Sequence, residues 1–296
     1  IAMAEESVAQ ARLRANPVLS VGGLKEVNGE DNRFNVGGAL PLELFGRRAR
    51  RTEFAERNVD VVRGTVANRE RLLTGEVKTR FGEALAAVRG LEFIDQLLQA
   101  NRDFLKLTED RVNQGAIGSL DADEVRVEVN RFAALRIDYQ AKAEIALLRL
   151  KEVAGIRPEE PIHLKGSIEQ AVRSVDHDQL LQMALGHRPD LMAQRANEAM
   201  AAADLRQRRV EAKPDATFSL SYERPNAGFS QRAFDPSGNL QHIRQTFNYA
   251  VFGLEISLPI FNRNQGAIAA GSVAISAAKS KVLAAELALR HDVLQS

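Results

Sequence analysis

The sequence predicts a mainly helical protein that also contains four β-strands and an internal duplication. Three observations indicate this fold class. Two distant stretches share one alternating pattern, each stretch is followed at once by a long helical pattern, and the first helical pattern carries a heptad repeat. We therefore expect two similar halves, each made of a β-hairpin joined to long antiparallel coiled-coil helices.

The duplicated stretches are VGGALPLELFGRRARR at 36–51 and FGLEISLPIFNRNQGA at 252–267. When Val36 is laid on Phe252, apolar residues of the two stretches coincide at every second position. The residues between them are small, polar or proline for the most part. Because successive side chains of a strand point to opposite faces, each strand is predicted to have one apolar and one polar face.

The composition excludes several classes of protein. Among 296 residues, 40 Lys and Arg balance 39 Asp and Glu, and a net charge of +1 gives no bulk attraction for nucleic acid. The absence of cysteine excludes disulfides, thiolate metal sites and a cysteine nucleophile. No run of about 20 apolar residues occurs, so we expect no membrane-spanning helix, whereas spanning strands remain allowed.

The first half begins with the tail of a helix at 1–15. Asn16-Pro17 ends this helix, because a residue before proline avoids the helical region. A β-hairpin follows over 16–46, and the turn-rich segment 28–32 separates its two strands. These strands are expected at 17–25 and 34–45.

The longest predicted element is a helical hairpin over 47–154 with its tip at 114–119. Helical periodicity runs without proline from Arg47 to Asn113, which at about 1.5 Å per residue is on the order of 100 Å of helix. Apolar residues at seven-residue spacing, with partners between them, indicate a coiled-coil seam. The seam comprises Val77, Phe81, Ala84, Val88, Leu91, Ile94, Leu98, Leu105 and Val112. After the tip, a second helix at about 120–154 must fold back antiparallel.

The second half repeats this order after a connector at 155–187, which contains a short helix at about 176–186. A helix at 188–213 opens with Arg188-Pro189-Asp190-Leu191, since proline and an acid suit a first helical turn. The second hairpin spans 214–262 with a long loop at 224–246, and another helix begins within 263–296. Because the chain starts and ends inside helical patterns, we expect it to be part of a longer protein that lacks both termini here.

Four strands of about ten residues are long enough to cross a bilayer when tilted. They cannot close a barrel, and an open edge in lipid would leave backbone groups unpaired, so other copies must complete the sheet. Two copies would give eight strands and three would give twelve, and the residues alone do not choose. The residues expected to face lipid are Leu40, Leu42, Leu44, Leu254, Ile256 and Leu258. Those expected to line water are Glu43, Gly253, Glu255 and Ser257.

The order of these elements, together with three motifs, resembles the TolC-type outer-membrane efflux proteins. The motifs are RPDL at 188–191, RVNQGAIGSLD at 111–121 and SLPIFNRNQG at 257–266, and the last looks most like the heavy-metal branch, CzcC-like and CusC-like. The resemblance covers the whole chain. It implies a homotrimer whose strands form one twelve-stranded barrel in the outer membrane of a Gram-negative-type bacterium, and whose helices form a tunnel that extends into the periplasm.

The resemblance also implies a function and partners. The function would be that of a passive duct in a tripartite efflux system, which exports small substrates such as heavy-metal cations. The partners would be a periplasmic adaptor, an inner-membrane pump of the resistance-nodulation-division class and outer-membrane lipid. The residues expected to contact the adaptor are Gly115, Ala116, Ile117, Gly118 and Ser119. The exported substrate, the gating residues of a second tip, and a signal peptide or lipid anchor lie outside what this sequence indicates.

The alternative is a soluble coiled-coil structural or interaction protein that carries β-hairpins. Apolar strand faces packed beneath the protein's own helices would favour that alternative. An enzyme is disfavoured, because the five histidines have no metal-ligand spacing and no nucleophile elbow, phosphate loop or zinc signature occurs. We therefore expect no catalytic residue, no cofactor and no resident metal.

Overall fold

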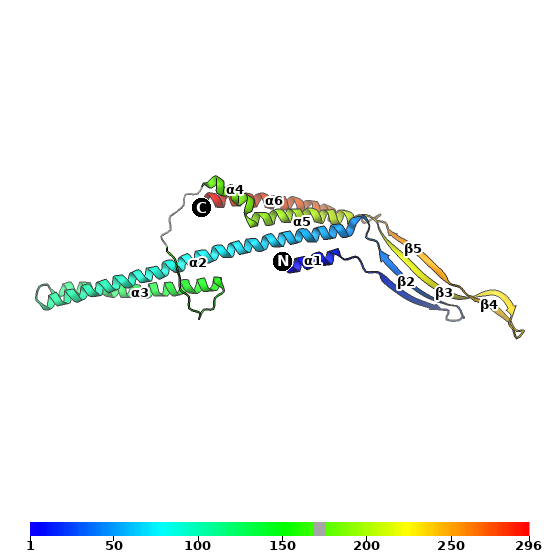
Figure 1. Ribbon diagram of the computed structural model, residues 1–296, viewed down its shortest axis with the longest axis horizontal. Helices are drawn as coiled ribbons and strands as arrows, with labels where there is room; N and C mark the ends of the chain where they lie inside the picture. The colour runs from blue at the N-terminus through cyan, green and yellow to red at the C-terminus, as the bar shows by residue number, and fades with distance from the viewer. Residues whose placement is uncertain (168–175, 296) are drawn as a thin grey trace. The chain divides into compact units, whose positions relative to one another are not determined.

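The computed structural model describes residues 1–167 and 176–295, and Figure 1 shows its elements in order. The part of the predicted connector at 168–175, like the last residue, lies outside the described residues. The helices are α1 (Ala2–Arg12), the short 3₁₀ helix η1 (Leu44–Gly46), α2 (Arg47–Asn113), α3 (Ser119–Ala154), α4 (His177–His187), α5 (Pro189–Glu211) and α6 (Gln265–Gln295). The strands are β1 (Val18–Lys25), β2 (Asn32–Pro41), β3 (Asp215–Phe234), β4 (Leu240–Thr246) and β5 (Tyr249–Ser257).

The chain divides into two compact units, and α2 runs from the first into the second. The first unit comprises Ile1–Val66 and His177–Ser296, and therefore holds all five strands. The second unit, Ala67–Asp176, is the helical hairpin of α2 and α3. The mainly helical fold with an antiparallel sheet is as predicted.

All five strands belong to one antiparallel sheet (Figure 1). The order is β1-β2-β3-β4, and β5 also pairs with β3. The long strand β3 makes this arrangement possible: its first part lies between β2 and β5, with Leu220 opposite both Gly38 and Phe252, and its last part pairs with β4. The outer edge of β1 and the second edge of β5 have no strand beside them in the described part of the chain.

The predicted loop at 224–246 is wrong, because most of this range is strand. β3 continues to Phe234, and β4 returns along it with Phe234 opposite Leu240 and a bulge between Gly228 and Arg232. The tight turn between them is closed by Asp235, whose carboxylate accepts the N–H groups of Asn239 at 2.9 Å and Ser237 at 2.8 Å. These backbone hydrogen bonds lower the pKa of Asp235. Cross-strand pairing thus outweighs the turn-forming residues that suggested a loop.

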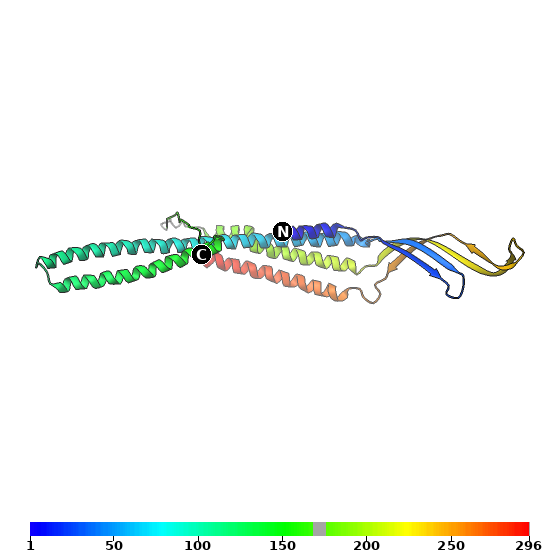
Figure 2. The same ribbon diagram turned by 90° about the horizontal axis from the view of Figure 1, so that it is seen from below.

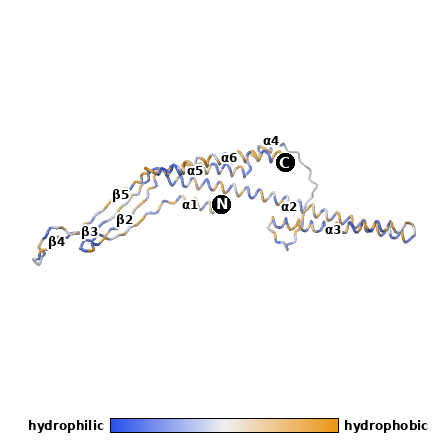
Figure 3. Tube along the Cα trace, turned by 180° about the vertical axis from the view of Figure 1, so that it is seen from behind, coloured by the Kyte–Doolittle hydropathy of each residue, from blue (hydrophilic) through white to orange (hydrophobic). Residues whose placement is uncertain are grey.

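The sheet has one apolar and one polar face, as the sequence predicts. The registers place on one face Leu19, Val21, Phe34, Val36, Leu40, Phe218, Leu220, Tyr222, Phe252, Leu254 and Ile256. The opposite face carries Ser20, Asn35, Gly37, Thr217, Ser219, Ser221, Glu223, Gly253, Glu255 and Ser257. The hydropathy of the trace alternates along these strands (Figure 3). Val36 is half-buried, and the other apolar side chains of this face are exposed, by 60% for Leu254 and 71% for Phe252, so no helix of the described chain covers them.

The helices of the first unit pack around two apolar cores. Ala4, Val8 and Ala11 of α1 form a core with Ala55 and Val59 of α2. A second core joins Leu191 of α5 to Val282 and Leu289 of α6. By length and composition alone, Gln265–Leu294 of α6 could cross a membrane, which differs from the expectation that no helix would. Alanine, leucine, valine and isoleucine make this helix apolar, and the small alanines and glycines also allow α6 to lie close along α5.

The RPDL motif at the start of α5 connects that helix to the end of α6. Pro189 occupies the first turn, where a missing N–H costs nothing. Arg188 donates to Asp190 at 3.0 Å and to Asp292 of α6 at 2.6 Å, and Leu191 is 1% exposed. The motif thus places one ion-paired and one buried side chain at a helix junction.

The second unit is an antiparallel helical hairpin (Figure 2), and its seam on α2 is the predicted one. The helix predicted from Arg47 to Asn113 is confirmed, as is the return helix, which begins at Ser119. Every predicted seam position on α2 is buried or half-buried. The buried residues of α3 along this seam are Ala122, Val129, Ala143 and Leu150. At Gly90, the missing side chain makes room for the ring of Tyr139, which would lie 3.0 Å from an added Cβ.

Candidate functional site

The residues predicted to line two faces of a membrane sheet separate in the structure, with corrections at the strand ends. Leu40, Leu254 and Ile256 lie on the apolar face, and Gly253, Glu255 and Ser257 on the polar face, as expected. Leu42 and Leu258 follow directly after the ends of β2 and β5, and Leu42 donates its N–H to the Ala216 carbonyl at 2.9 Å.

Glu43 and Leu44 are not strand residues, so their predicted places on the two faces are wrong. β2 ends at Pro41 rather than at Phe45. Glu43 and Phe45 both have a left-handed backbone, with φ of 48° and 57°, which no extended strand allows. Leu44 begins the 3₁₀ helix η1. The alternation of the sequence continues past Pro41, but the chain has already turned towards α2.

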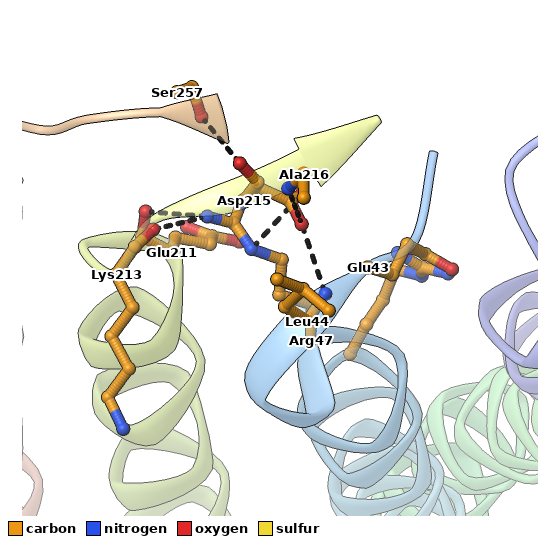
Figure 4. A network of polar contacts seen from close by, with 9 residues as sticks. Glu43, Leu44, Arg47, Glu211, Lys213, Asp215, Ala216 and Ser257 are labelled. Atoms are coloured by element: carbon orange, nitrogen blue, oxygen red, sulfur yellow. Dashed lines mark hydrogen bonds and ion pairs between the residues drawn. The ribbon is translucent and has the colours of Figure 1, made fainter. Parts of the chain in front are cut away.

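A carboxylate closes this turn from the other half of the chain (Figure 4). Asp215, the first residue of β3, accepts the N–H groups of Leu44 and Ala216 at its Oδ1, each at 3.0 Å. Its Oδ2 lies 3.4 Å from Nε of Arg47, which makes an ion pair without hydrogen-bond geometry. The carboxylate therefore joins the end of β2 to the start of β3.

Arg47 connects the same junction to the end of α5 (Figure 4). Its Nη2 donates to the carbonyl oxygens of Lys213 at 2.6 Å and Glu211 at 3.3 Å, which are free at the end of this helix. A cation near a helix C-terminus is also favoured by the helix dipole. The Lys213 ammonium in turn lies 5.2 Å from the ring centre of Phe45. Arg47 thus holds the first residues of α2 against the last residues of α5.

Arg51 has the same role towards α1. It donates to the carbonyl oxygens of Ala11 at 3.1 Å and Leu13 at 2.9 Å, and its Nη1 donates to Glu43 at 2.7 Å. Glu43 is thus a partner of Arg51 instead of a residue of the polar strand face. The sequence analysis missed Arg47, Arg51 and Asp215; the only signal was their position at strand–helix boundaries.

The predicted tip residues form a tight, exposed turn. Gly115 has φ of +72°, and its N–H donates to Val112 while that of Ala116 donates to Arg111, both at 2.9 Å. These bonds end α2 with a left-handed glycine, a common helix terminus. The N–H of Gly118 donates to the Asp121 carboxylate at 3.2 Å, which starts α3. Ile117 is half-buried, and the other four residues from Gly115 to Ser119 are exposed.

No group of three or more His, Cys, Asp and Glu side chains that could hold a metal ion occurs among residues 1–167 and 176–295. The sheet and the tip offer exposed apolar rows, hydroxyls, carboxylates and strand edges.

The family model for outer membrane efflux proteins matches residues 1–156 and 180–296. The chain belongs to this family. The resemblance noted in the sequence is thereby confirmed, and the family's location is the outer membrane with an extension into the periplasm. It is a family of channel proteins, which agrees with a transport role in place of an enzymatic one.

Individual relatives agree with this assignment. The cobalt-zinc-cadmium resistance protein CzcC of Cupriavidus metallidurans is 26% identical over 297 residues, which cover 99% of this chain and 65% of CzcC. The chain thus spans less than two thirds of that relative. The outer membrane protein VceC of Vibrio cholerae has the same fold with a TM-score of 0.69 at 16% identity, covering 99% of this chain and 72% of VceC. The transmembrane channel protein CusC has a TM-score of 0.65, also at 16% identity, covering 99% and 67%.

Proposed function

We propose that this protein is the outer-membrane channel of a tripartite efflux system, a passive duct made of three copies. The observation that carries the proposal is the two-faced sheet, which exposes an apolar row and, among the described residues, leaves the outer edges of β1 and β5 unpaired. Lipid tolerates an exposed apolar row but no open edge. Three copies would join their β1–β2–β3–β5 sheets into one twelve-stranded barrel, with the apolar face towards lipid and the polar face towards water.

The lipid-facing set would comprise Leu40, Leu254 and Ile256, together with their neighbours on the apolar face. Gly253, Glu255 and Ser257 would line the water-filled interior. Gly37 and Gly253 lie against Ser221 and Ser219 on that face, where an added Cβ would collide with the serine side chains, so only short side chains occupy these points of the proposed lining. The duct itself would supply no energy, so transport would depend on a pump.

The partners would be a periplasmic adaptor and an inner-membrane pump of the resistance-nodulation-division class. The tip from Gly115 to Ser119 is the surface proposed for the adaptor, because its exposed backbone and small side chains allow close approach of a second helical turn. A photo-crosslinker at Ser119 should then label the adaptor, whereas the same probe at exposed Arg131 on α3 should not. Equal labelling from both positions would contradict this placement.

The proposed substrates are heavy-metal cations, a class supported by the CzcC likeness. The test is a strain that lacks the gene, challenged with zinc, cobalt, cadmium, copper and a panel of drugs. It should stop growing at lower metal concentrations, and a plasmid copy should restore growth where an empty plasmid does not. Sensitivity to drugs alone would overturn the metal assignment and leave the duct. Unchanged growth with every compound, together with a monomer in detergent extracts, would overturn the duct.

A further inference from the structure

The pairing of β2 with β3 joins the two halves of the chain, and it provides a template for the contact that the second edge of β5 lacks in one chain. The first residues of β1 and β3 are equivalent, and their partners are Ala39 for Val18 and Ser257 for Asp215. Ala39 of β2 is therefore equivalent to Ser257 of β5. The starts of the following helices agree with this, because Gly46 (φ 76°) precedes α2 and Asn264 (φ 55°) precedes α6.

This equivalence corrects the alignment expected from the sequence. It lays Val36 on Leu254, two residues from Phe252, and it brings the dipeptide Leu40-Pro41 onto Leu258-Pro259. A shift of two residues keeps every side chain on its own face, so the alternating pattern could not reveal it.

β2 extends two residues further towards its helix than β5 does, and the strand pairing explains this difference. Leu40 and Pro41 extend beyond Ala39, the last residue paired with β1, and they pair with Phe218 and Thr217 of β3. β5 stops at Ser257, its last residue paired with β3. Leu258 and Pro259 are the equivalents of Leu40 and Pro41, and Leu258 is 64% exposed. β5 ends where a neighbour on its second edge would continue it.

We propose that this neighbour is β1 of a second copy of the chain, held in the register that β2 and β3 already show. That register places Pro259 opposite Ser20, Ser257 opposite Gly22 and Glu255 opposite Leu24 of the second copy. β5 then continues as a strand through Leu258 and Pro259. The proposal rests on the proposed function, and it adds to it the alignment of the two chains.

The faces of the two strands agree in this register. Leu258 comes to lie beside Val21 of the second copy on the apolar face, and Ser257 lies beside Gly22 on the polar face. The apolar row of one chain thus continues into that of the next without a break. Any register that differs by an odd number of residues would put Leu258 beside a residue of the polar face.

The contact between copies differs from its template in one respect. The template contains the Arg47–Asp215 ion pair and the bonds from Arg47 to the end of α5. The equivalents of these two residues are Gln265 and Val18, which cannot form an ion pair. This ion pair therefore helps to join the halves of one chain and has no counterpart in the proposed contact between copies.

Cysteine pairs test the register, and the chain has no cysteine of its own to interfere. The pair Leu24→Cys with Glu255→Cys should form a disulfide between copies, because directly opposite residues lie about 4.5–5.5 Å apart, within the range that a disulfide spans. Within one chain, Leu24 and Glu255 lie on opposite edges of the sheet, with β2 and β3 between them, so the two cysteines cannot form a disulfide inside one chain. The full chain would be purified from outer membranes and run without reductant.

The matched control is Ser20→Cys with Ser257→Cys, which are diagonal neighbours about 7–8 Å apart in the proposed register. We expect covalent trimers for the first pair, lost on reduction, and at most a trace for the control and for each single variant. Cross-linking of the control pair instead would overturn the register and leave the duct intact. A trimer in which neither pair cross-links would overturn the contact itself. A monomer would overturn the proposed function as well.

Discussion

Asp215 accepts the backbone N–H of Leu44 at 3.0 Å, although 171 positions of sequence separate them. The bond fixes the first residue of β3 against the chain just beyond β2. It also holds η1, where Glu43 and Phe45 have left-handed backbones that are uncommon for residues other than glycine. One side chain thus stabilises the turn through which the sheet passes into α2.

Asp215→Ala should lower the free energy of unfolding by about 1–3 kcal/mol, because two N–H groups and Arg47 lose their acceptor. Asp215→Asn should cost less, since an amide oxygen can still accept. Ser257→Ala is the control, as its hydroxyl makes only a 3.5 Å contact at the same junction. Thermal unfolding followed by circular dichroism measures the change, and equal melting temperatures for the Ala variant and the parent would contradict the assigned role.

Neighbouring residues on β5 test the two faces of the sheet. Leu254→Arg should cost about 2–4 kcal/mol, the cost of a cation on the lipid face of a barrel near the bilayer centre, and should reduce the protein recovered from outer membranes. Glu255→Arg reverses a charge one residue away on the polar face, and it should leave that amount nearly unchanged. Immunoblots of membrane fractions compare the two. A loss with Glu255→Arg alone would mean that the faces are exchanged.

The sequence was sufficient where local signals decide the structure. The sequence predicts helix α2 from Arg47 to Asn113 because periodicity, the absence of proline and the turn at Gly115 are all signals that act within a few residues. The seam of the hairpin was found for the same reason. The two faces of each strand were also predicted correctly, since an even shift in register leaves every side chain on the same face.

Contacts between distant segments could not be predicted in this way. Nothing near Arg47 indicates that its partners are Asp215 and the last carbonyls of α5. The extension of β3 through Pro225 and Gly228 depends on β2 and β4 beside it, while local preference favours a loop. The two-residue error in the repeat alignment has the same origin, because only strand pairing shows which residues are equivalent.

Replacing a glycine of α2 by alanine should lower the stability of the protein at one position and raise it at another. A Cβ at Gly64 would lie 2.9 Å from the backbone Cα of Ala193 on α5, so Gly64→Ala forces the helices apart and should destabilise the protein by about 1–3 kcal/mol. Gly75 has nothing within 4 Å of an added Cβ, and Gly75→Ala should stabilise α2 by about 0.5–1 kcal/mol. Melting temperatures should therefore move in opposite directions. A rise for both variants would show that α2 and α5 are not in close contact.

Glu53 should make stability depend on pH in the acid range. A hydrogen bond from Arg50 lowers the pKa of its carboxyl, partial burial opposes this, and Arg206 of α5 lowers the pKa further. Because the folded-state pKa is depressed, the stabilisation is complete above the unfolded pKa, about 4.3, and is lost as the pH falls through the folded value.

Glu53→Gln should therefore cost about 1 kcal/mol at pH 7, and the difference from the parent should shrink below about pH 4. Glu70→Gln, a change at an exposed carboxylate of the same helix, serves as the control and should be nearly neutral throughout. Melting curves at several pH values give the comparison. A difference that is the same at pH 3 and pH 7 would rule out the ion pairs as its source.

The ion pair of the internal junction can be built into the contact between copies. Val18→Asp combined with Gln265→Arg reproduces Asp215 and Arg47 at their equivalent positions, and Val18 is 59% exposed at the first residue of β1, where a carboxylate can be accommodated. The double variant should raise the temperature at which trimers dissociate, since each ion pair adds about 1 kcal/mol at three contacts. Val18→Asp alone should lower that temperature, because the carboxylate then has no cation beside it. If both variants dissociate at the same temperature, Gln265 of one copy does not lie beside Val18 of the next, and the register between the chains must differ from that between β2 and β3.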